Sequence, residues 1–438
     1  MTRGPSVPRR GLAWSVTALV VGVLAACSSE PAEVSGEVSG DGVIVTPTER
    51  SPTGYEVTFR YWAPDAEAVG LVGDAYFTSP DAITRTLGHD ARLGDDWRPG
   101  DVSHPLVSQP PAALELQPDG WWELATAMPA GTYSYGFVEG ECERAALCRG
   151  HLDPTNPPPF AGEEGAGHQR TSQVYVPSDS EHPTYDVGYE SDAAEGERGR
   201  LEHHTYASAL STAPEGERAL GVYLPSGYDP DRPEPYPLLV LSHGMGENET
   251  AWFADGRAAQ ILDHAIADGD IPAIVAVTTD FGGLTDEPTG SAAFHAAYVD
   301  ELTTGVLPYV ESAFHVSSER DHRAFGGLSM GGALAVGLLE RHPELFAWYG
   351  IWSAAPVPEG WHGLDAQARR AVRQAAGIHV GVGVDDGIVG IADSSPERAA
   401  AYREAGGRVT ETNVPGAHTW QVWRAELHAF LTTTAFAQ

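Results

Sequence analysis

One serine in the C-terminal half of the chain has the surroundings that a nucleophile requires. The run Gly327-Leu328-Ser329-Met330-Gly331 places glycines two residues before and two residues after Ser329. A serine presented between a strand and a helix needs a sharp, strained turn, and glycines at these positions let the neighbouring backbones pass. The pattern alone is weak, because the chain contains 50 glycines. A short apolar strand at 323–326 and a helix at 333–341 supply the required context, so Ser329 is the predicted nucleophile.

A histidine further along the chain is placed to act as general base for this serine. The run Val414-Pro415-Gly416-Ala417-His418-Thr419-Trp420 follows the last apolar strand and opens the last predicted helix. In α/β-hydrolases the chain order is serine, then acid, then histidine, and His418 fits that order. Three other downstream histidines are expected at a helix end, in a strand and in the terminal helix: His342, His379 and His428.

The acid that orients this histidine should follow the predicted strand at 378–384. Asp385 and Asp386 both do so, and only one of them can point inward. The acid of such a triad holds the imidazole in its working tautomer and stabilises the imidazolium ion. We take Asp386 as the acid, with Asp385 as the first alternative and Asp393 as a more distant one.

Backbone amides of an earlier loop could complete the site. The run Ser242-His243-Gly244-Met245-Gly246 comes directly after the apolar strand at 238–241. An amide of this loop, for which we choose Met245, would join the amide of Met330 in facing a carbonyl oxygen under attack, where negative charge develops. His243 lies inside the motif, and we assign it a structural role rather than that of the base.

Two regions with different hydrophobic periods must position these residues. Residues 201–438 alternate strands with helices, one of which we expect at 396–405, and this alternation predicts a doubly wound, mostly parallel sheet covered on both faces. Residues 43–177 contain short strands rich in aromatic residues between turns, with a possible helix only near 143–147, which predicts a smaller all-β sandwich. Residues 178–200 are acidic and contain Pro, Gly and Ser, as expected of a linker.

Together, these motifs resemble the putative-esterase family of α/β-hydrolases. The resemblance spans 201–430 and rests on four runs of sequence: 326–332, His243-Gly244, 416–420 and the opening strand 218–225. The family holds feruloyl and acetylxylan esterases, S-formylglutathione hydrolases, enterochelin esterases and mycolyltransferases. The resemblance implies an α/β-hydrolase fold. It also supports Asp386, because Gly383-Val384-Asp385-Asp386 matches the Gly-x-x-Asp of the family.

The N-terminal region has a resemblance of its own. The runs 59–64, 131–135 and 153–156 are similar to the immunoglobulin-like domain that precedes the catalytic domain in enterochelin esterases. Three tryptophans of this region, Trp62, Trp121 and Trp122, could form a carbohydrate site. Packing in the sandwich core and at an inter-domain contact is the favoured interpretation, because aromatic side chains dominate core burial.

The first 26 residues have the features of a bacterial lipoprotein signal peptide. A positively charged start precedes the short apolar stretch 12–24, which ends in Leu24-Ala25-Ala26-Cys27. We expect Cys27 to be lipidated and 27–42 to be a flexible tether. The protein would then lie on the outer side of the cytoplasmic membrane, held by this anchor only. An ordinary secretory signal, with secretion of the protein, is the alternative.

The cysteine content and the net charge restrict the kinds of molecule and ion that the protein is expected to bind. Cys142 and Cys148 lie close together in a chain expected to be exported, which favours a local disulfide over a metal site. The formal net charge of −35 argues against binding to nucleic acid and against attraction to anionic lipid. The sequence does not predict an oligomeric state.

The chemistry that these residues predict is two-step acyl transfer, with no metal or organic cofactor. Feruloyl or acetyl esters of polysaccharide are the first expectation for the substrate, because an anchored exported enzyme meets polymers outside the cell. A siderophore trilactone, acyl transfer within the cell envelope and a non-catalytic binding lipoprotein on a hydrolase scaffold remain alternatives.

Overall fold

The computed structural model describes residues 42–83, 91–104, 109–163, 171–178, 181–182, 186–210, 216–356, 363–388 and 390–437. These residues belong to one compact unit, Gly40–Gln438. The predicted signal peptide, Cys27 and all but the last residue of the predicted tether lie outside the described residues. Within the described ranges, no helix combines the length and the apolar character that crossing a bilayer requires.

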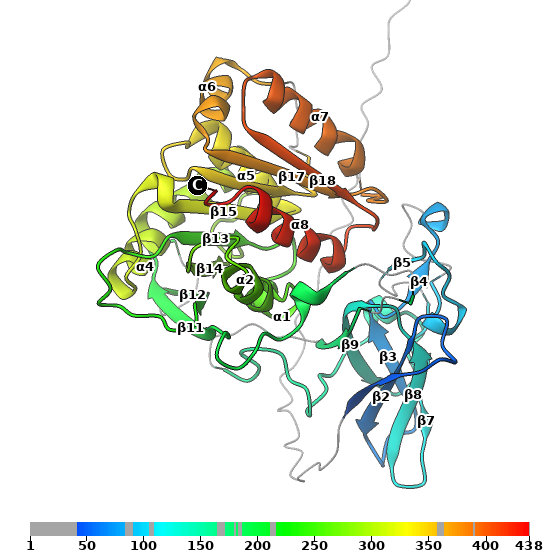
Figure 1. Cartoon of the computed structure of the whole chain (residues 1–438). Helices are drawn as coiled ribbons and strands as arrows, with labels where there is room; N and C mark the ends of the chain where they lie inside the picture. The colour runs from blue at the N-terminus through cyan, green and yellow to red at the C-terminus, as the bar shows by residue number, and fades with distance from the viewer. Residues whose placement is uncertain are drawn as a thin grey trace, which may run out of the picture. The chain divides into compact units, whose positions relative to one another are not determined.

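The N-terminal region contains two four-stranded antiparallel sheets (Figure 1). The first has the order β1 (Val43–Pro47), β2 (Tyr55–Trp62), β8 (Trp121–Ala127), β7 (Glu115–Leu116). The second has the order β10 (Ser172–Val176), β9 (Gly131–Glu139), β3 (Val69–Gly73), β6 (Ala112–Ala113). A separate two-stranded ladder pairs β4 (Phe77–Thr78) with β5 (Val102–Ser103).

The two four-stranded sheets share one hydrophobic core. Along β2, Val57, Phe59 and Tyr61 are buried, whereas the residues between them are more exposed, as a period of two requires. Phe59 packs edge-on against Tyr135 at 5.0 Å, and Tyr61 stacks on Phe137 at 4.6 Å, so the rings join the sheets. These contacts make the region a sandwich of two sheets.

The three tryptophans of this region differ in exposure. Trp121 and Trp122 are buried, at 8% exposed each, whereas Trp62 is 39% exposed. The Trp122 indole donates a hydrogen bond to Ala63 O, and Trp122 belongs to the sandwich core. Trp121 packs edge-on against Trp62 at 5.6 Å.

The C-terminal region is built on one mixed sheet of eight strands. Its order is β11 (Arg200–Ala207), β12 (Glu217–Leu224), β14 (Val275–Thr279), β13 (Leu238–Ser242), β15 (Arg323–Leu328), β16 (Trp348–Trp352), β17 (Gly377–Gly383), β18 (Val409–Val414). The β11–β12 and β12–β14 pairs are antiparallel, and every later pair is parallel. The loops that follow β13, β15, β17 and β18 therefore leave the same edge of the sheet.

Helices cover both faces of this sheet (Figure 1). One face packs against α1 (Ala251–Ala254), α2 (Ala258–Ala267) and α8 (Trp420–Thr433). The other packs against α3 (Ala292–Glu301), α4 (Leu307–Ala313), α5 (Met330–Arg341), α6 (Ala366–Gln374) and α7 (Ile391–Glu404). Successive residues of β13 enter opposite cores, Val240 on one side and Leu241 on the other. Burial on both faces explains why the central strands are apolar throughout.

Two local predictions differ from the structure. A helix was expected to begin at Pro396, but α7 begins at Ile391 and contains Pro396 in its interior. Proline is compatible with the first turn of a helix because its missing amide is unused there, which is why Pro396 suggested a start. The possible helix at 143–147 is a single 3₁₀ turn, Ala145–Leu147, within the loop that the Cys142–Cys148 disulfide closes.

A fully buried arginine on α8 connects the two regions. Arg424 Nη2 donates to Thr132 O of β9 at 2.5 Å, and Nη1 donates to Asp255 O at 2.7 Å. Its Nε lies 3.1 Å from Glu190 Oε2 in the segment predicted to be a linker. Asp255 also accepts a hydrogen bond from Ser134 Oγ at 3.0 Å. One guanidinium group therefore contacts polar groups from three parts of the chain.

Replacing Arg424 by methionine should be strongly destabilising. The change leaves the buried carboxylate of Glu190 without its charge partner, which costs about 3–5 kcal/mol for buried pairs of this kind. The free energy of unfolding in urea measures the effect.

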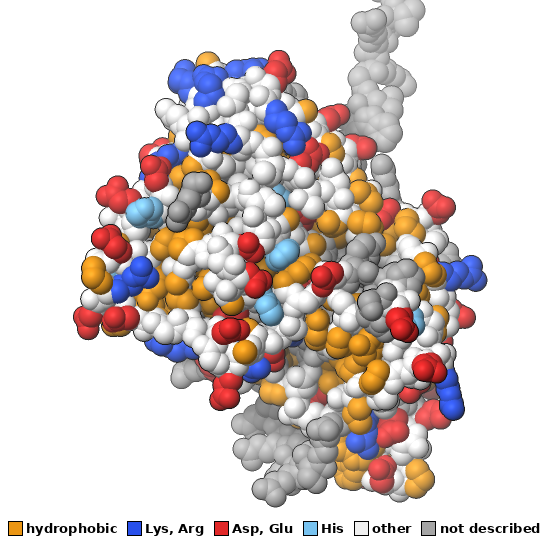
Figure 2. All heavy atoms as spheres, viewed as in Figure 1, with side chains coloured by type: hydrophobic (Ala, Val, Ile, Leu, Met, Phe, Trp, Pro, Cys, Tyr) orange, Lys and Arg blue, Asp and Glu red, His pale blue; other side chains and the backbone are white. Residues whose placement is uncertain are grey.

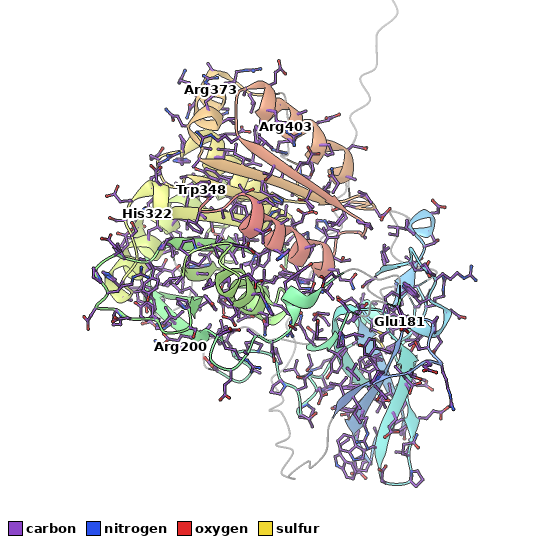
Figure 3. The ribbon with its side chains drawn as sticks, in the orientation of Figure 1. Glu181, Arg200, His322, Trp348, Arg373 and Arg403 are labelled. Atoms are coloured by element: carbon purple, nitrogen blue, oxygen red, sulfur yellow. A yellow bond between two sulfur atoms is a disulfide. The ribbon has the colours of Figure 1, made fainter. Side chains whose placement is uncertain are left out.

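Arg403→Met is the matched control. Arg403 lies on α7 (Figure 3) and pairs with Glu411 at 2.6 Å, but 43% of its side chain is exposed. Loss of an exposed pair should cost no more than about 1 kcal/mol. Equal destabilisation by the two variants would contradict a special role for Arg424.

Candidate active site

The predicted nucleophile lies in a strained turn between β15 and α5. Ser329 has φ 50° and ψ −110°, a conformation that costs a non-glycine residue free energy and persists only where neighbours hold it. Its amide donates to Trp352 O at 2.9 Å, and its carbonyl accepts from Ala355 N at 2.8 Å. The turn is thus fixed by the residues that end and follow β16, and the Ser329 side chain remains partly exposed.

The flanking glycines are required by close backbone contacts. A Cβ on Gly327 would lie 2.4 Å from Gly331 C, and a Cβ on Gly331 would lie 2.4 Å from Ser242 O. Neither contact can be relieved by a side-chain rotation, because the opposing atoms are backbone. Gly331 N also donates to His243 O at 3.0 Å, which joins the elbow to the loop after β13.

The predicted base and acid form a hydrogen-bonded pair at the same edge of the sheet. His418 Nδ1 lies 2.7 Å from Asp386 Oδ2. The Asp386 side chain is fully buried, and 15% of the His418 side chain is exposed. Trp423 packs edge-on against the imidazole at 4.9 Å. With Nδ1 facing the carboxylate, Nε2 is the nitrogen left to exchange a proton with another group.

The two adjacent aspartates after β17 make different contacts. Asp385 Oδ2 accepts a hydrogen bond from Gly416 N at 3.1 Å, within the loop that carries His418. Asp386 faces the imidazole itself, and its second oxygen accepts from Ile388 N at 3.1 Å. Asp393, the third candidate, lies in the first turn of α7. The geometry therefore favours Asp386 as the acid and gives Asp385 the task of holding the loop.

Between Ser329 Oγ and His418, both in the described part of the chain, no hydrogen bond is formed. In enzymes without substrate such contacts are commonly long and tighten only in the complex. Ser329 follows β15 and His418 follows β18, so the loop 415–419 must span the width of the two intervening strands. Asp385 and Asp386 both form hydrogen bonds with this loop. These bonds hold the loop at the edge of the sheet where Ser329 lies.

The candidate amide donors come from two places, Met245 in the loop after β13 and Met330 at the start of α5. Met330 is the first residue of α5, so no earlier turn of that helix can use its amide. Met245 is 67% exposed, which leaves the loop accessible from solvent. His243 is buried, stacks on Phe281 at 4.1 Å and places Nε2 3.1 Å from Asp280 Oδ1. These contacts suit the structural role assigned to His243.

A carboxylate missing from the sequence predictions lies beside the nucleophile. Glu247 Oε2 accepts a hydrogen bond from Gly244 N at 2.8 Å. A Cβ on Gly244 would lie 3.2 Å from Glu247 Oε2 and 3.6 Å from Ser329 Cβ, so both side chains border the same glycine. Burial raises the pKa of Glu247 to about 7, although His243 and the Gly244 amide act in the opposite direction. An acidic residue three positions after His243-Gly244 was the available signal.

Within the described ranges, no group of three or more His, Cys, Asp or Glu side chains is arranged to hold a metal ion. The site holds a serine, a histidine, a carboxylate and backbone amides. That set suits nucleophilic attack on an electrophilic carbonyl followed by proton transfer.

A sequence profile of the putative esterase family matches residues 211–434, about half of the chain. The chain belongs to this family of carboxylic ester hydrolases. The resemblance drawn from the motifs is thereby confirmed, and so is the α/β-hydrolase-type fold of the C-terminal region.

Two curated relatives combine this esterase sequence with other segments. An endo-1,4-β-xylanase/feruloyl esterase of Xylanibacter ruminicola is 35% identical over 213 residues, which are 46% of this chain and 27% of the relative. Endo-1,4-β-xylanase Y of Acetivibrio thermocellus is 37% identical over 145 residues, 31% of this chain and 12% of the relative. This esterase chain spans about a quarter or less of the length of these two proteins.

A solved structure resembles this chain in fold over most of its length. The enterochelin esterase of Shigella flexneri superposes with a TM-score of 0.53 at 17% identity, covering 90% of this chain and 95% of its own. At this identity the likeness concerns the fold of the esterase chain alone.

Asp386→Asn should lower kcat for ester hydrolysis by roughly four orders of magnitude, because an amide stabilises the wrong imidazole tautomer. Asp385→Asn is the matched control. Its side-chain oxygen can still accept from Gly416 N, so the loss should stay below about tenfold. Kinetics on a soluble aryl ester measures both, and the reverse ranking would make Asp385 the acid.

Glu247→Gln should change the pH dependence of the esterase. Glu247 is neutral below its raised pKa of about 7 and carries a negative charge above it. That charge beside Ser329 opposes the oxyanion formed during attack. The ratio of kcat/KM for the variant to that for the unaltered protein should therefore rise roughly two- to tenfold from pH 6 to pH 8. A ratio that stays constant across this range would exclude the effect.

Proposed function

We propose that this protein is a serine esterase that hydrolyses carboxylic esters through an acyl-enzyme. The observation that carries the proposal is the 2.7 Å contact of His418 Nδ1 with the buried Asp386, on a loop that leaves the same edge of the sheet as the strained turn of Ser329. Membership of the esterase family supports it. A non-catalytic scaffold would have no need to keep the strained serine, the buried acid and the oriented histidine together.

The chemistry follows from the orientation of these groups. His418 Nε2 accepts the Ser329 Oγ proton as the hydroxyl oxygen attacks the ester carbonyl. The Met330 and Met245 amides stabilise the oxyanion, and the alcohol leaves with the proton from His418. Water then attacks the acyl-serine in the same manner and regenerates the free hydroxyl. Asp386 remains ionised and stabilises the imidazolium ion throughout.

We infer that the substrate is a feruloyl or acetyl ester of a polysaccharide. The esterase sequence of this chain matches parts of two xylanases, one of which is also named a feruloyl esterase. A polymeric ester also fits the proposed location of the protein, anchored through Cys27 on the outer side of the cytoplasmic membrane. The immunoglobulin-like character of the N-terminal sandwich is part of the same proposal, by its likeness to the enterochelin-esterase layout.

Ser329→Ala should lower kcat by roughly four to six orders of magnitude while the fold survives. The unaltered protein should also be labelled by a fluorophosphonate probe at Ser329, and the variant should not. Ester turnover close to normal in the variant would remove Ser329 from the mechanism. A folded, unaltered protein that resists the probe would favour the non-catalytic scaffold.

The substrate is tested on the same preparation with a panel of esters. Methyl ferulate and acetylated xylan should be hydrolysed faster than an enterobactin-type trilactone. Preference for the trilactone would assign the esterase to siderophores, and transfer of the acyl group to a sugar in place of water would identify an acyltransferase.

A further inference from the structure

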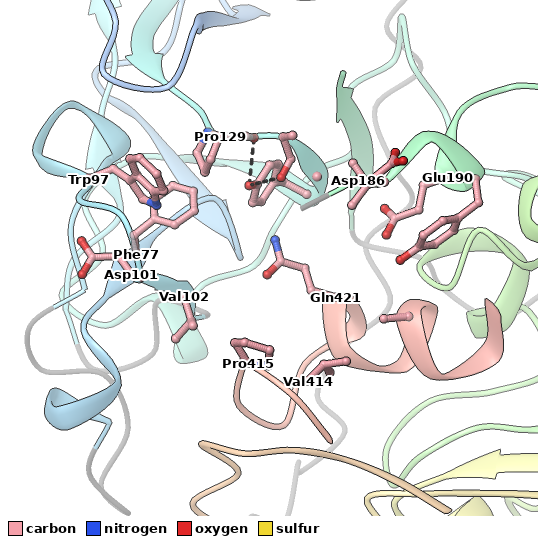
Figure 4. Close-up of a pocket in the computed structure, with 17 residues that line it drawn as sticks. Phe77, Trp97, Asp101, Val102, Pro129, Asp186, Glu190, Val414, Pro415 and Gln421 are labelled. Carbon is pink, nitrogen blue, oxygen red and sulfur yellow. Dashed lines mark hydrogen bonds between the residues drawn. The ribbon is translucent and has the colours of Figure 1, made fainter. Parts of the chain in front are cut away.

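A pocket of about 420 Å³ lies between the N-terminal sandwich and α8 (Figure 4). Its volume falls within the range of small-molecule sites. Three parts of the chain line it: residues 77, 97, 100–102, 129–131 and 133 of the sandwich region, 186, 187, 189 and 190 of the predicted linker, and 414, 415, 421 and 425 around the start of α8. Neither Ser329 nor His418 lines it, so the pocket is additional to the catalytic groups.

The sandwich supplies an aromatic wall. Phe77 packs edge-on against Tyr133 at 5.6 Å, and both rings line the pocket together with Trp97. Tyr133 donates its hydroxyl proton to Pro129 O at 3.0 Å, so that ring is fixed in place (Figure 4). Rigid aromatic surfaces of this kind pack against the apolar C–H faces of a ligand.

One wall group is a buried donor without a partner. Trp97 is 6% exposed, and its Nε1–H makes no hydrogen bond among the described residues. A buried donor left unpaired costs free energy, so indoles in protein interiors usually find an acceptor. The Nε1 atom is itself almost wholly covered, so a ligand oxygen reaches it as acceptor only when the indole turns toward the pocket.

The remaining polar groups favour a neutral ligand with hydroxyl groups. Asp101, Asp186 and Glu190 line the pocket, and no arginine, lysine or histidine does so among the described lining residues. Asp101 is paired with Arg92 at 2.8 Å, and Glu190 is paired with Arg424. Asp186, which accepts from Gly188 N, has no ion pair among the described residues, so a ligand hydroxyl group can donate to it and a carboxylate ligand is disfavoured.

The floor of the pocket is the segment that holds the proposed base. Val414 and Pro415 precede His418 by three to four residues, and Gln421 follows it by three. Figure 4 shows Gln421 projecting from α8 into the middle of the pocket. A ligand held here would contact both ends of the short loop that presents His418.

We propose that this pocket binds one or two sugar rings of the polysaccharide that carries the ester. The inference rests on the proposed function for the choice of a sugar, because the ester-bearing chain is the neutral, hydroxyl-rich molecule that the site would meet. Binding beside the His418 loop makes the pocket an accessory site for the substrate chain, where the main chain is held while a side-chain ester is cleaved at Ser329.

The test is binding of unesterified xylo-oligosaccharides, from xylobiose to xylohexaose, to the full chain by isothermal titration calorimetry. We expect saturable binding. Trp97→Phe keeps a six-membered aromatic ring but removes the pyrrole ring with its N–H, so it should weaken binding roughly three- to tenfold. Its melting temperature should fall only through the packing lost in the sandwich core, because the N–H has no hydrogen-bond partner to lose. Ala425→Phe, which fills the pocket from a partly exposed position on α8, should weaken binding more than tenfold.

Trp62→Phe is the control, because it alters an exposed indole of the sandwich that does not line the pocket. Its dissociation constant should stay within twofold. Absence of saturable binding, or binding that neither pocket variant weakens, would overturn the proposal. Binding of ferulic acid in place of the oligosaccharides, sensitive to the same variants, would also overturn it. Labelling of Ser329 by the fluorophosphonate is independent of these results, so the accessory site and the esterase can fail separately.

Discussion

A close approach of backbone segments at Gly331 determines where the nucleophile lies. The first turn of α5 packs so tightly on the end of β13 that a single added carbon would meet Ser242 O at 2.4 Å. The Gly331 amide bonds to His243 O in the same place. Ser329 is thereby held in a conformation that few L-residues adopt, and its neighbours β15 and β16 supply the remaining restraints. This contact therefore fixes the serine and the loop after β13 relative to each other.

Carboxylates in this site differ through their surroundings rather than through their chemistry. Asp385 and Asp386 are adjacent in sequence, yet one bonds to a backbone amide and the other to an imidazole. Glu247 bonds to Gly244 N in a partly buried place where its charge is costly, so its pKa rises. Three acids of the same kind thus hold a loop, orient a base and place a titrating group beside the serine.

The sequence predicted the helices and strands that have a clear hydrophobic periodicity or contain a recognisable motif. The apolar strands, the helix after Ser329 and the candidate triad positions follow from glycine spacing and from the order of strands and loops. The start of α7 was misplaced, because Pro396 resembles a first-turn residue while the helix tolerates one lost hydrogen bond. The role of Glu247 could not be predicted from the sequence, because it depends on the fold of the loop after β13, in which Glu247 accepts a hydrogen bond from Gly244 N. The partners of Arg424 are 169 and 292 residues away in sequence, and no local pattern reports contacts of that kind.

The buried arginine of α8 has a consequence for the order in which the protein assembles during synthesis. The sandwich strands and the segment at Glu190 emerge from the ribosome well before Arg424 does. Until α8 arrives, Glu190 and the carbonyl of Thr132 must remain hydrated, and the two regions lack their shared cation. The sandwich can form early, and Ser134 and Thr171 can donate to Asp255 before α8 is made, but the contact between the regions is incomplete until Arg424 arrives. The same late step brings in the histidine loop, so a nascent chain acquires its proposed base and the Arg424 contact together.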